Sequence, residues 1–128
     1  MQATPIAVAP RRSLSSRVPP NQVTGILLLL FAAELVFWVL FRLVNLDEGW
    51  YLWAAKEVVA GRQLYGDFAY TQTPLLPYVY GLAQLVLGQG LYAGRVLTAG
   101  FGFAAGVLSM ATARRIAGPW AGVFALAL

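Results

Sequence analysis

An apolar stretch of 23 residues, 24–46, constrains this chain more than any other feature, and its only charged residues are Glu34 and Arg42. A helix needs roughly 20 residues to cross a bilayer core of about 30 Å, so this stretch is long enough. A signal peptide is the alternative, since basic residues precede the stretch, but the stretch is too long and no Ala-x-Ala-type cleavage site follows it. We therefore predict a first transmembrane helix over residues 24–46, with Arg42 reaching the interface.

The composition supports lipid as the solvent. Of 128 residues, 59% are hydrophobic and 11% are charged, and a soluble domain of this size could not bury that much apolar surface. The nine basic residues form no single patch, which argues against nucleic acid as a partner. The chain has no Cys and no His, so disulfides, thiolate metal sites and histidine proton transfer are excluded within it.

A second span is predicted over residues 93–113, where Gly102 and Gly106 form a pair of small residues suited to close helix packing in lipid. An arginine pair, residues 114–115, follows it directly. Residues 1–23 contain four Pro, three Arg and no acid, which predicts a disordered basic tail. The positive-inside tendency places both the tail and the arginine pair in the cytoplasm.

Between the two spans lies a shorter apolar stretch, Leu75–Leu87. As a helix it covers about 20 Å, against the roughly 30 Å that a crossing requires. Two basic groups on one side of a membrane require an even number of crossings between them, and the two predicted spans supply these. We expect this stretch to lie at the outer interface, with Tyr78, Tyr80 and Tyr92 at head-group depth. The alternative is a short third span that puts the arginine pair outside.

Together these assignments predict an all-α, polytopic protein of the cell (inner) membrane with a cytoplasmic N-terminus. Residues 47–92 are expected to form an extracytoplasmic loop with two interfacial helices, one over 47–61 and one over 74–88. Residues 114–118 are expected to form a cytoplasmic turn. Residues 119–128 begin a third span that is too short to cross, so we expect the chain to be an N-terminal fragment.

Two consecutive carboxylates, Asp47 and Glu48, stand where the first helix leaves the membrane. Asn45 is expected to cap a new helix there, and acids in its first turn favour the helix dipole. Neighbouring residues on a helix face different ways. One acid is therefore expected to meet a substrate while a basic residue holds the other. The candidates for that basic partner are Arg42, Lys56 and Arg62. The alternative is that both acids merely mark the start of a helix.

Trp50, Trp53, Ala54 and Val58 recur at helical spacing after the two acids. They predict an apolar stripe that rests on the bilayer surface, and anchoring explains the tryptophans better than a platform for a sugar ring. Gly61 is expected to end this helix.

Five short motifs follow one another along the chain outside the tail. They are Asp47-Glu-Gly-Trp-Tyr51, Ala60-Gly-Arg-Gln-Leu-Tyr-Gly-Asp67, Gln72-Thr-Pro-Leu-Leu-Pro-Tyr78, Ala93-Gly-Arg-Val96 and the Arg114–Arg115 pair. Their order and spacing resemble the bacterial family 39 glycosyltransferases, which include protein O-mannosyltransferases and the aminoarabinose transferases of lipid A. The acid pair is the most specific of these elements.

The resemblance implies a polytopic fold of the GT-C type with an active site on the extracytoplasmic face. Such enzymes pass a sugar from a polyprenyl-phosphate carrier to a glycan, lipid or protein acceptor. Asp47 would then be the catalytic base or acceptor-binding carboxylate, with Glu48 supporting the site. A fragment of such an enzyme is expected to be inactive alone.

The same resemblance suggests three residues for contact with the donor phosphate, namely Arg95, Arg62 and Thr73. Arg95, in the Ala-x-Arg element, would be a phosphate or a structural partner. Aminoarabinose transferases have a Lys immediately before the loop Pro, where this chain has Thr73 before Pro74. A phosphate contact from that position would have to be a hydroxyl, which argues against aminoarabinose as the sugar.

Glu34 lies in the middle of the first span, where ionisable residues are functional candidates. We favour a protonated or helix-paired structural role for it, because it lies far from the expected outer site. A functional Glu34 would instead indicate a multi-pass transporter, and a small structural membrane subunit is the third alternative. The residues identify no cofactor, and dependence on a divalent metal is left open. Carboxylates suit a hard divalent cation, but two acids without His do not make a metal site.

Overall fold

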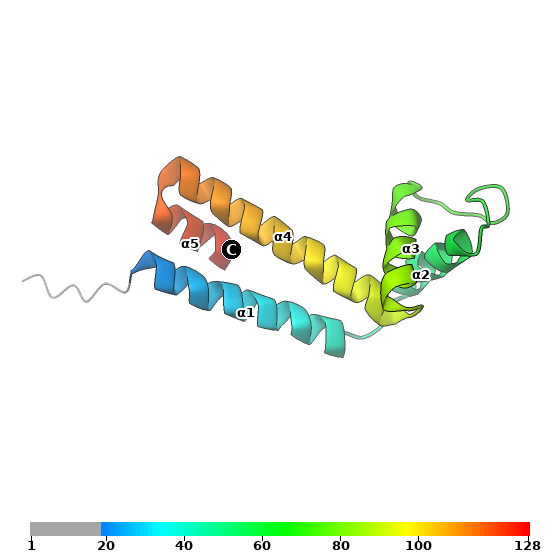
Figure 1. The fold of residues 1–128 in the computed structure, drawn as a ribbon, viewed down its shortest axis with the longest axis horizontal. Coiled ribbons are helices and arrows are strands. Elements are labelled where there is room, and N and C mark those ends of the chain that lie inside the picture. Colours follow the sequence, from blue (N-terminus) through cyan, green and yellow to red (C-terminus); the bar gives the residue numbers. More distant parts are fainter. Residues whose placement is uncertain (1–18) are drawn as a thin grey trace, which may run out of the picture.

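The computed structural model describes residues 19–128, and helices account for 77% of them. Figure 1 shows their arrangement. The five helices are α1 (Pro20–Phe41), α2 (Leu46–Val59), α3 (Leu75–Leu87), α4 (Leu91–Ala117) and α5 (Pro119–Ala127). The predicted all-α class is confirmed for this part of the chain, where the sole β feature is an isolated bridge between Leu64 and Phe68. Of the predicted disordered tail, residues 1–18 lie outside the described residues, and the prediction is wrong for residues 20–23, which belong to α1.

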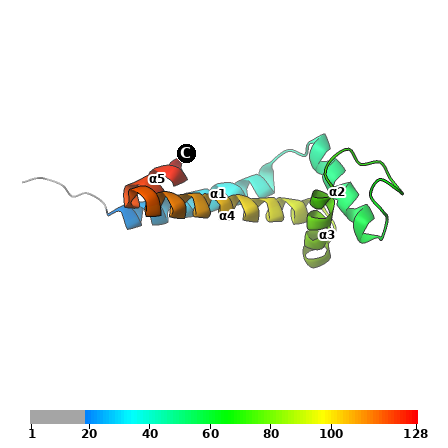
Figure 2. The same ribbon diagram turned by 90° about the horizontal axis from the view of Figure 1, so that it is seen from above.

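Two helices, α1 and α4, lie side by side and antiparallel (Figures 1 and 2). Both are long and apolar enough to cross a membrane, as predicted. We call the end of this pair that carries α2 and α3 the loop end, and the opposite end the turn end.

The boundaries of both long helices differ from the predicted ones. Helix α1 begins four residues before position 24, because Pro20 occupies its first turn, where a missing N–H costs nothing. It ends at Phe41 rather than at residue 46. Helix α4 extends the predicted span 93–113 at both ends, to Leu91 and Ala117.

The early end of α1 follows from the start of α2. Arg42 leaves the helical region, with ψ at 135°. Asn45 is extended, and its Oδ1 accepts a hydrogen bond of 2.7 Å from the backbone N–H of Glu48. This is the predicted cap, and it starts a new helix in a new direction, so the intervening residues cannot continue α1.

Small residues let α1 and α4 approach closely, as the Gly102–Gly106 pair predicts. A Cβ on Gly106 would lie 2.6 Å from Cε1 of Phe31, and one on Gly102 would lie 3.7 Å from Cδ2 of Leu35. Phe31 also stacks on Phe103 at 5.9 Å between ring centroids. The pair therefore faces α1, and larger side chains there would push the two helices apart.

At the turn end, Gly118 reverses the chain with φ at 89°, a conformation that favours glycine. Helix α5 then folds back against α4 and α1 (Figure 1). Gly122 lies directly against the side chain of Arg114, whose Nη2 donates a 2.8 Å hydrogen bond to Oδ1 of Asn21. The start of α1 and the end of α4 thus meet.

The predicted turn over residues 114–118 is shorter in the structure. Both arginines belong to the last turn of α4, and Gly118 alone separates α4 from α5. Cations in the last turn favour the helix dipole, which is a physical reason for the helix to include them.

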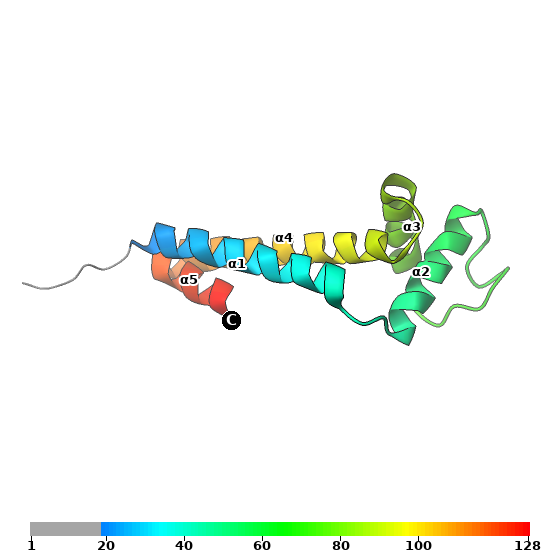
Figure 3. The same cartoon turned by 90° about the horizontal axis from the view of Figure 1, so that it is seen from below.

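At the loop end, α2 packs on α3. Ala54 and Ala55 are completely buried, and Gly81 of α3 brings its backbone close to the carbonyl oxygen of Ala55. Helix α3 runs across the end of α4 instead of alongside it (Figures 1 and 3). The placement of residues 75–87 at the outer interface, without a third crossing, stays a prediction.

The predicted surface stripe of α2 is wrong in part, because Ala54 is completely buried. Trp50 and Trp53 are 37% and 39% exposed and stack on each other at 5.0 Å between ring centroids. The loop after α2 covers them from one side, with Phe68 against Trp53 and Tyr70 against Trp50. The helix ends near Gly61, as predicted, where φ is 85°.

Candidate functional site

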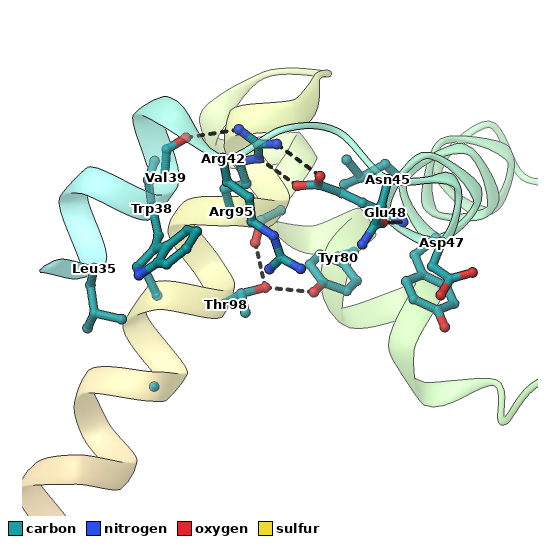
Figure 4. A pocket seen from close by; sticks show the side chains of 15 residues that line it. Leu35, Trp38, Val39, Arg42, Asn45, Asp47, Glu48, Tyr80, Arg95 and Thr98 are labelled. Atoms are coloured by element: carbon teal, nitrogen blue, oxygen red, sulfur yellow. Dashed lines mark hydrogen bonds and ion pairs between the residues drawn. The ribbon is translucent and has the colours of Figure 1, made fainter. Parts of the chain in front are cut away.

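A cavity of about 680 Å³ opens at the loop end between α1, the start of α2 and the start of α4 (Figure 4). We call it the α1/α4 cavity. Residues from α1 and α4 form its apolar part, namely Leu35, Trp38, Val39, Ala99 and Gly102. Polar residues form its rim, namely Arg42, Asn45, Asp47, Glu48, Tyr51, Tyr80, Arg95 and Thr98. The acid pair and Arg95, three of the predicted site residues, therefore lie together.

Glu48 and Arg95 form a bidentate ion pair at the centre of the rim. Nε of Arg95 lies 2.6 Å from Oε1 of Glu48, and Nη2 lies 3.0 Å from Oε2. This parallel arrangement is the strongest geometry open to an arginine and a carboxylate. Hydrogen bonding to Arg95 holds the pKa of the Glu48 carboxyl below its usual value, against an opposing effect of burial, and the charge of Arg42 lowers it further. Glu48 is therefore a carboxylate at neutral pH.

Arg95 also joins the two long helices. Its Nη1 donates to the backbone carbonyl of Val39 at 3.2 Å, next to the end of α1. The residue is only 8% exposed. One guanidinium thus connects α1, α2 and α4, as the dashed lines of Figure 4 show. Arg95 was predicted to be either a phosphate ligand or a structural partner, and this geometry fits the structural partner.

The structure supports the prediction that a basic residue holds one acid of the pair, but it corrects the partner. Arg42, Lys56 and Arg62 were the candidates. The partner is Arg95, which is 47 positions away from Glu48 in the sequence. Folding brings the two together because α4 returns antiparallel to α1, and no local spacing indicates that contact.

Asp47 differs from its neighbour. It is exposed and lines the cavity, and no hydrogen bond or ion pair of its carboxylate occurs among residues 19–128. Consecutive positions on a helix point about 100° apart, so a partner for Glu48 does not engage Asp47. Asp47 is the carboxylate of the pair that is open to a ligand.

Two polar contacts of the rim escape the sequence patterns. The hydroxyls of Tyr80 and Thr98 lie 2.7 Å apart, and Thr98 also donates to the carbonyl of Gly94 at 2.9 Å. Tyr80 was predicted to stand at head-group depth, yet it turns toward α4. Nothing in the sequence around Tyr80 predicts this contact, because it depends on how α3 crosses α4.

Tyr51 is a third residue of the rim that the sequence patterns did not single out. Its hydroxyl accepts a 2.7 Å hydrogen bond from Nε2 of Gln72, whose backbone carbonyl in turn accepts from the hydroxyl of Tyr65. This chain ties the loop after α2 to the cavity. The spacing of Tyr51 four residues after Asp47 places both on one face of a helix, and that is the signal that could have found it.

Two predicted phosphate ligands lie outside the cavity. Arg62 binds Glu57 at 2.6 Å and the carbonyl of Asp67 at 2.9 Å, within the loop. Thr73 is exposed in the same loop and does not line the cavity. The structure does not bring these residues to the acid pair, and their contact with a donor phosphate stays a prediction.

Glu34 lies on an exposed side of α1, outside the cavity. Its Oε1 accepts a hydrogen bond of 3.4 Å from the indole N–H of Trp38, one turn along the same helix. This is the helix-paired arrangement that the structural interpretation of Glu34 expects. Within residues 19–128, no three acidic side chains come close enough together to hold a metal ion.

Comparison of the chain with protein-family models, with curated protein sequences and with solved structures found no match. The functional argument therefore depends on the motifs and on the geometry of the α1/α4 cavity.

Proposed function

We propose that the chain belongs to a membrane glycosyltransferase of the GT-C type, which transfers a sugar from a polyprenyl-phosphate donor to an acceptor at the extracytoplasmic face. One observation carries this proposal. The α1/α4 cavity joins an apolar part between two membrane-length helices to a rim with an available carboxylate, Asp47. A ligand that fits both parts has an apolar chain and a polar head, as a lipid-linked sugar has.

The chemistry of the transfer divides between two groups. The acceptor oxygen attacks the anomeric carbon of the sugar, and the bond from that carbon to the phosphate oxygen breaks. The phosphate leaves with the electron pair as a stable anion, so it needs electrostatic support more than a strong acid. The acceptor hydroxyl loses its proton, and a carboxylate beside it accepts that proton.

In this proposal Asp47 is the base and Glu48 is a positioning residue. Glu48 is engaged by both of its oxygens with Arg95 and is poorly placed to accept a proton. Asp47 keeps both oxygens available, and the Asn45 cap fixes the helix turn on which it stands. Holding the base on a fixed turn supplies the orientation that catalysis requires.

The test compares Asp47→Asn with Glu57→Gln in membrane vesicles that contain the natural full-length protein. Undecaprenyl-phosphate sugars serve as donors, and the release of undecaprenyl phosphate is measured. We expect Asp47→Asn to reduce the rate by a factor of about 10² to 10⁴, the usual contribution of a general base. Glu57 lies outside the cavity and pairs with Arg62, so its variant controls for loss of a loop acid. Unchanged release with Asp47→Asn would remove Asp47 from the mechanism.

A further inference from the structure

Four charged side chains line the α1/α4 cavity, and two of them neutralise each other. Glu48 and Arg95 form the bidentate pair, and the remaining nitrogen of Arg95 donates to Val39. Three of the five N–H groups of Arg95 are therefore engaged, one on each nitrogen. Its charge is already neutralised by Glu48, and an anion that took the bidentate position would have to break a well-aligned, partly buried ion pair, which is costly. Arg95 is a poor candidate for binding a ligand anion.

The other cation of the cavity is Arg42, and its situation is the opposite. Arg42 is exposed, and among residues 19–128 its guanidinium has no hydrogen bond or ion pair. Its charge nevertheless acts on the cavity, because it contributes to the lowered pKa of Glu48. Arg42 is thus the available positive charge at the rim.

The position of Arg42 directly after α1 connects this charge to the apolar part of the cavity. Leu35, Trp38 and Val39 lie in the last two turns of α1, and all three line the cavity. Their spacing of three and four residues places them on one face of α1. Arg42 directly follows this face, so a ligand chain that lies along it and leaves the apolar part at the end of α1 would place its polar end near Arg42.

We propose that Arg42 is the residue that binds the anionic group of the ligand, and that this group is the phosphate of a polyprenyl lipid. The inference rests on the proposed function and adds the residue that recognises the donor. A guanidinium binds a phosphate through two parallel hydrogen bonds, and the charge of the pair suits a leaving group that is an anion. Because the apolar face of α1 can bind a hydrocarbon chain, the cavity should bind a lipid phosphate more tightly than free phosphate.

The experiment measures binding of undecaprenyl phosphate to the full-length protein in nanodiscs of neutral lipid. Three variants are compared with the wild type, namely Arg42→Gln, Arg42→Lys and Arg115→Gln. We expect Arg42→Gln to weaken binding about 10- to 100-fold, the usual effect of losing hydrogen bonds to a charged group. Arg42→Lys keeps the charge and should weaken binding only a few-fold. Arg115 is exposed at the turn end, and its variant should bind as the wild type does.

Competing ligands identify what the site recognises. Undecaprenol lacks the phosphate, and we expect it to bind wild type and Arg42→Gln equally. Inorganic phosphate and phosphatidylglycerol should compete poorly. Full competition by inorganic phosphate would overturn the role of the chain, and full competition by phosphatidylglycerol would overturn the polyprenyl specificity.

The failure of this inference is distinguishable from the failure of the proposed function. If wild type binds undecaprenyl phosphate and Arg42→Gln binds it equally well, only the assignment to Arg42 is wrong. If wild type does not bind it at all, both proposals fail. Circular dichroism of each variant checks that the helix content is unchanged, and Arg42→Lys keeps the test decisive if Arg42→Gln inserts poorly.

Discussion

Both ends of α4 carry an arginine that contacts α1, and the two ends use it differently. At the loop end, Arg95 is buried in an ion pair with Glu48 and a cavity stays open beside it. At the turn end, Arg114 makes one exposed hydrogen bond to Asn21 while Gly122 closes the space against it. The comparison teaches that close packing at a small residue, Gly122, is enough to hold the helices together at the turn end, which the α1/α4 cavity does not reach. Where a space between α1 and α4 remains, Arg95 of α4 holds α1 through a hydrogen bond to Val39 and α2 through the ion pair with Glu48.

The largest effect should come from breaking the ion pair. Arg95→Met leaves the partly buried carboxylate of Glu48 without its partner and removes the hydrogen bond to Val39, so it should lower the unfolding temperature more than any of the substitutions below. Thermal unfolding of the purified protein in detergent measures it. Arg115→Gln, an exposed arginine on the same helix, is the matched control. Equal unfolding temperatures for the two variants would contradict the distinction between the ends.

Packing between the long helices should give the next effect. Gly106→Leu inserts a side chain against Phe31 and should cost about 1–3 kcal/mol by overpacking. Gly100→Leu on the same helix meets nothing within 4 Å and is the control. The same unfolding measurement applies, and we expect the Gly100 variant to unfold near the wild-type temperature. A larger loss at Gly100 than at Gly106 would show that α4 packs through a different face.

Acid should weaken the loop end alone. The pKa of Glu48 is lower in the folded protein than in the unfolded chain. Its contribution is therefore complete above the unfolded pKa, and it is lost as the pH falls through the lower folded pKa. We expect the unfolding temperature of the wild type to drop across that acidic range. The drop should be smaller in Glu48→Gln, which no longer titrates there, and an identical drop would assign the acid sensitivity to other groups.

The smallest effect should come from the turn end. Arg114→Gln removes one exposed hydrogen bond to Asn21, and such contacts contribute about 1 kcal/mol or less. Unfolding temperatures of Arg114→Gln and Asn21→Ala, measured side by side, should both lie close to that of the wild type. A loss as large as that of Arg95→Met would mean that both ends depend on their arginine.

Much of the fold was predictable because hydropathy and local signals are properties of neighbouring residues. The two long helices, the Asn45 cap, the end of α2 at Gly61 and the close packing at Gly106 all follow from short stretches of sequence. The end of α1 was not predictable from hydropathy, because residues 42–46 are mostly apolar and the cap of the next helix overrides them.

The site was predictable only in part. The acid pair and Arg95 were identified from motifs, and the structure brings them together. The sequence did not predict that Glu48 is the acid in an ion pair or that Arg95 is its partner. That contact forms because α4 returns beside α1, and no local pattern in either helix indicates it. Tyr80 and Thr98 meet for the same reason, at the crossing of α3 and α4. From the sequence, Arg42 was predicted only as an interface residue and as a possible partner of the acid pair. That its guanidinium has no partner among residues 19–128 is visible only once the other charged side chains of the cavity are placed.

The short non-helical segment between α1 and α2 has a mechanical consequence. Its four residues, 42–45, reach at most about 13 Å when fully extended. Asp47 is therefore tethered close to the end of α1, and any vertical shift of that helix moves the carboxylate with it. Bilayers of different thickness shift and tilt such helices. In the proposed orientation, membrane thickness sets how far a dissolved acceptor must descend to reach the base.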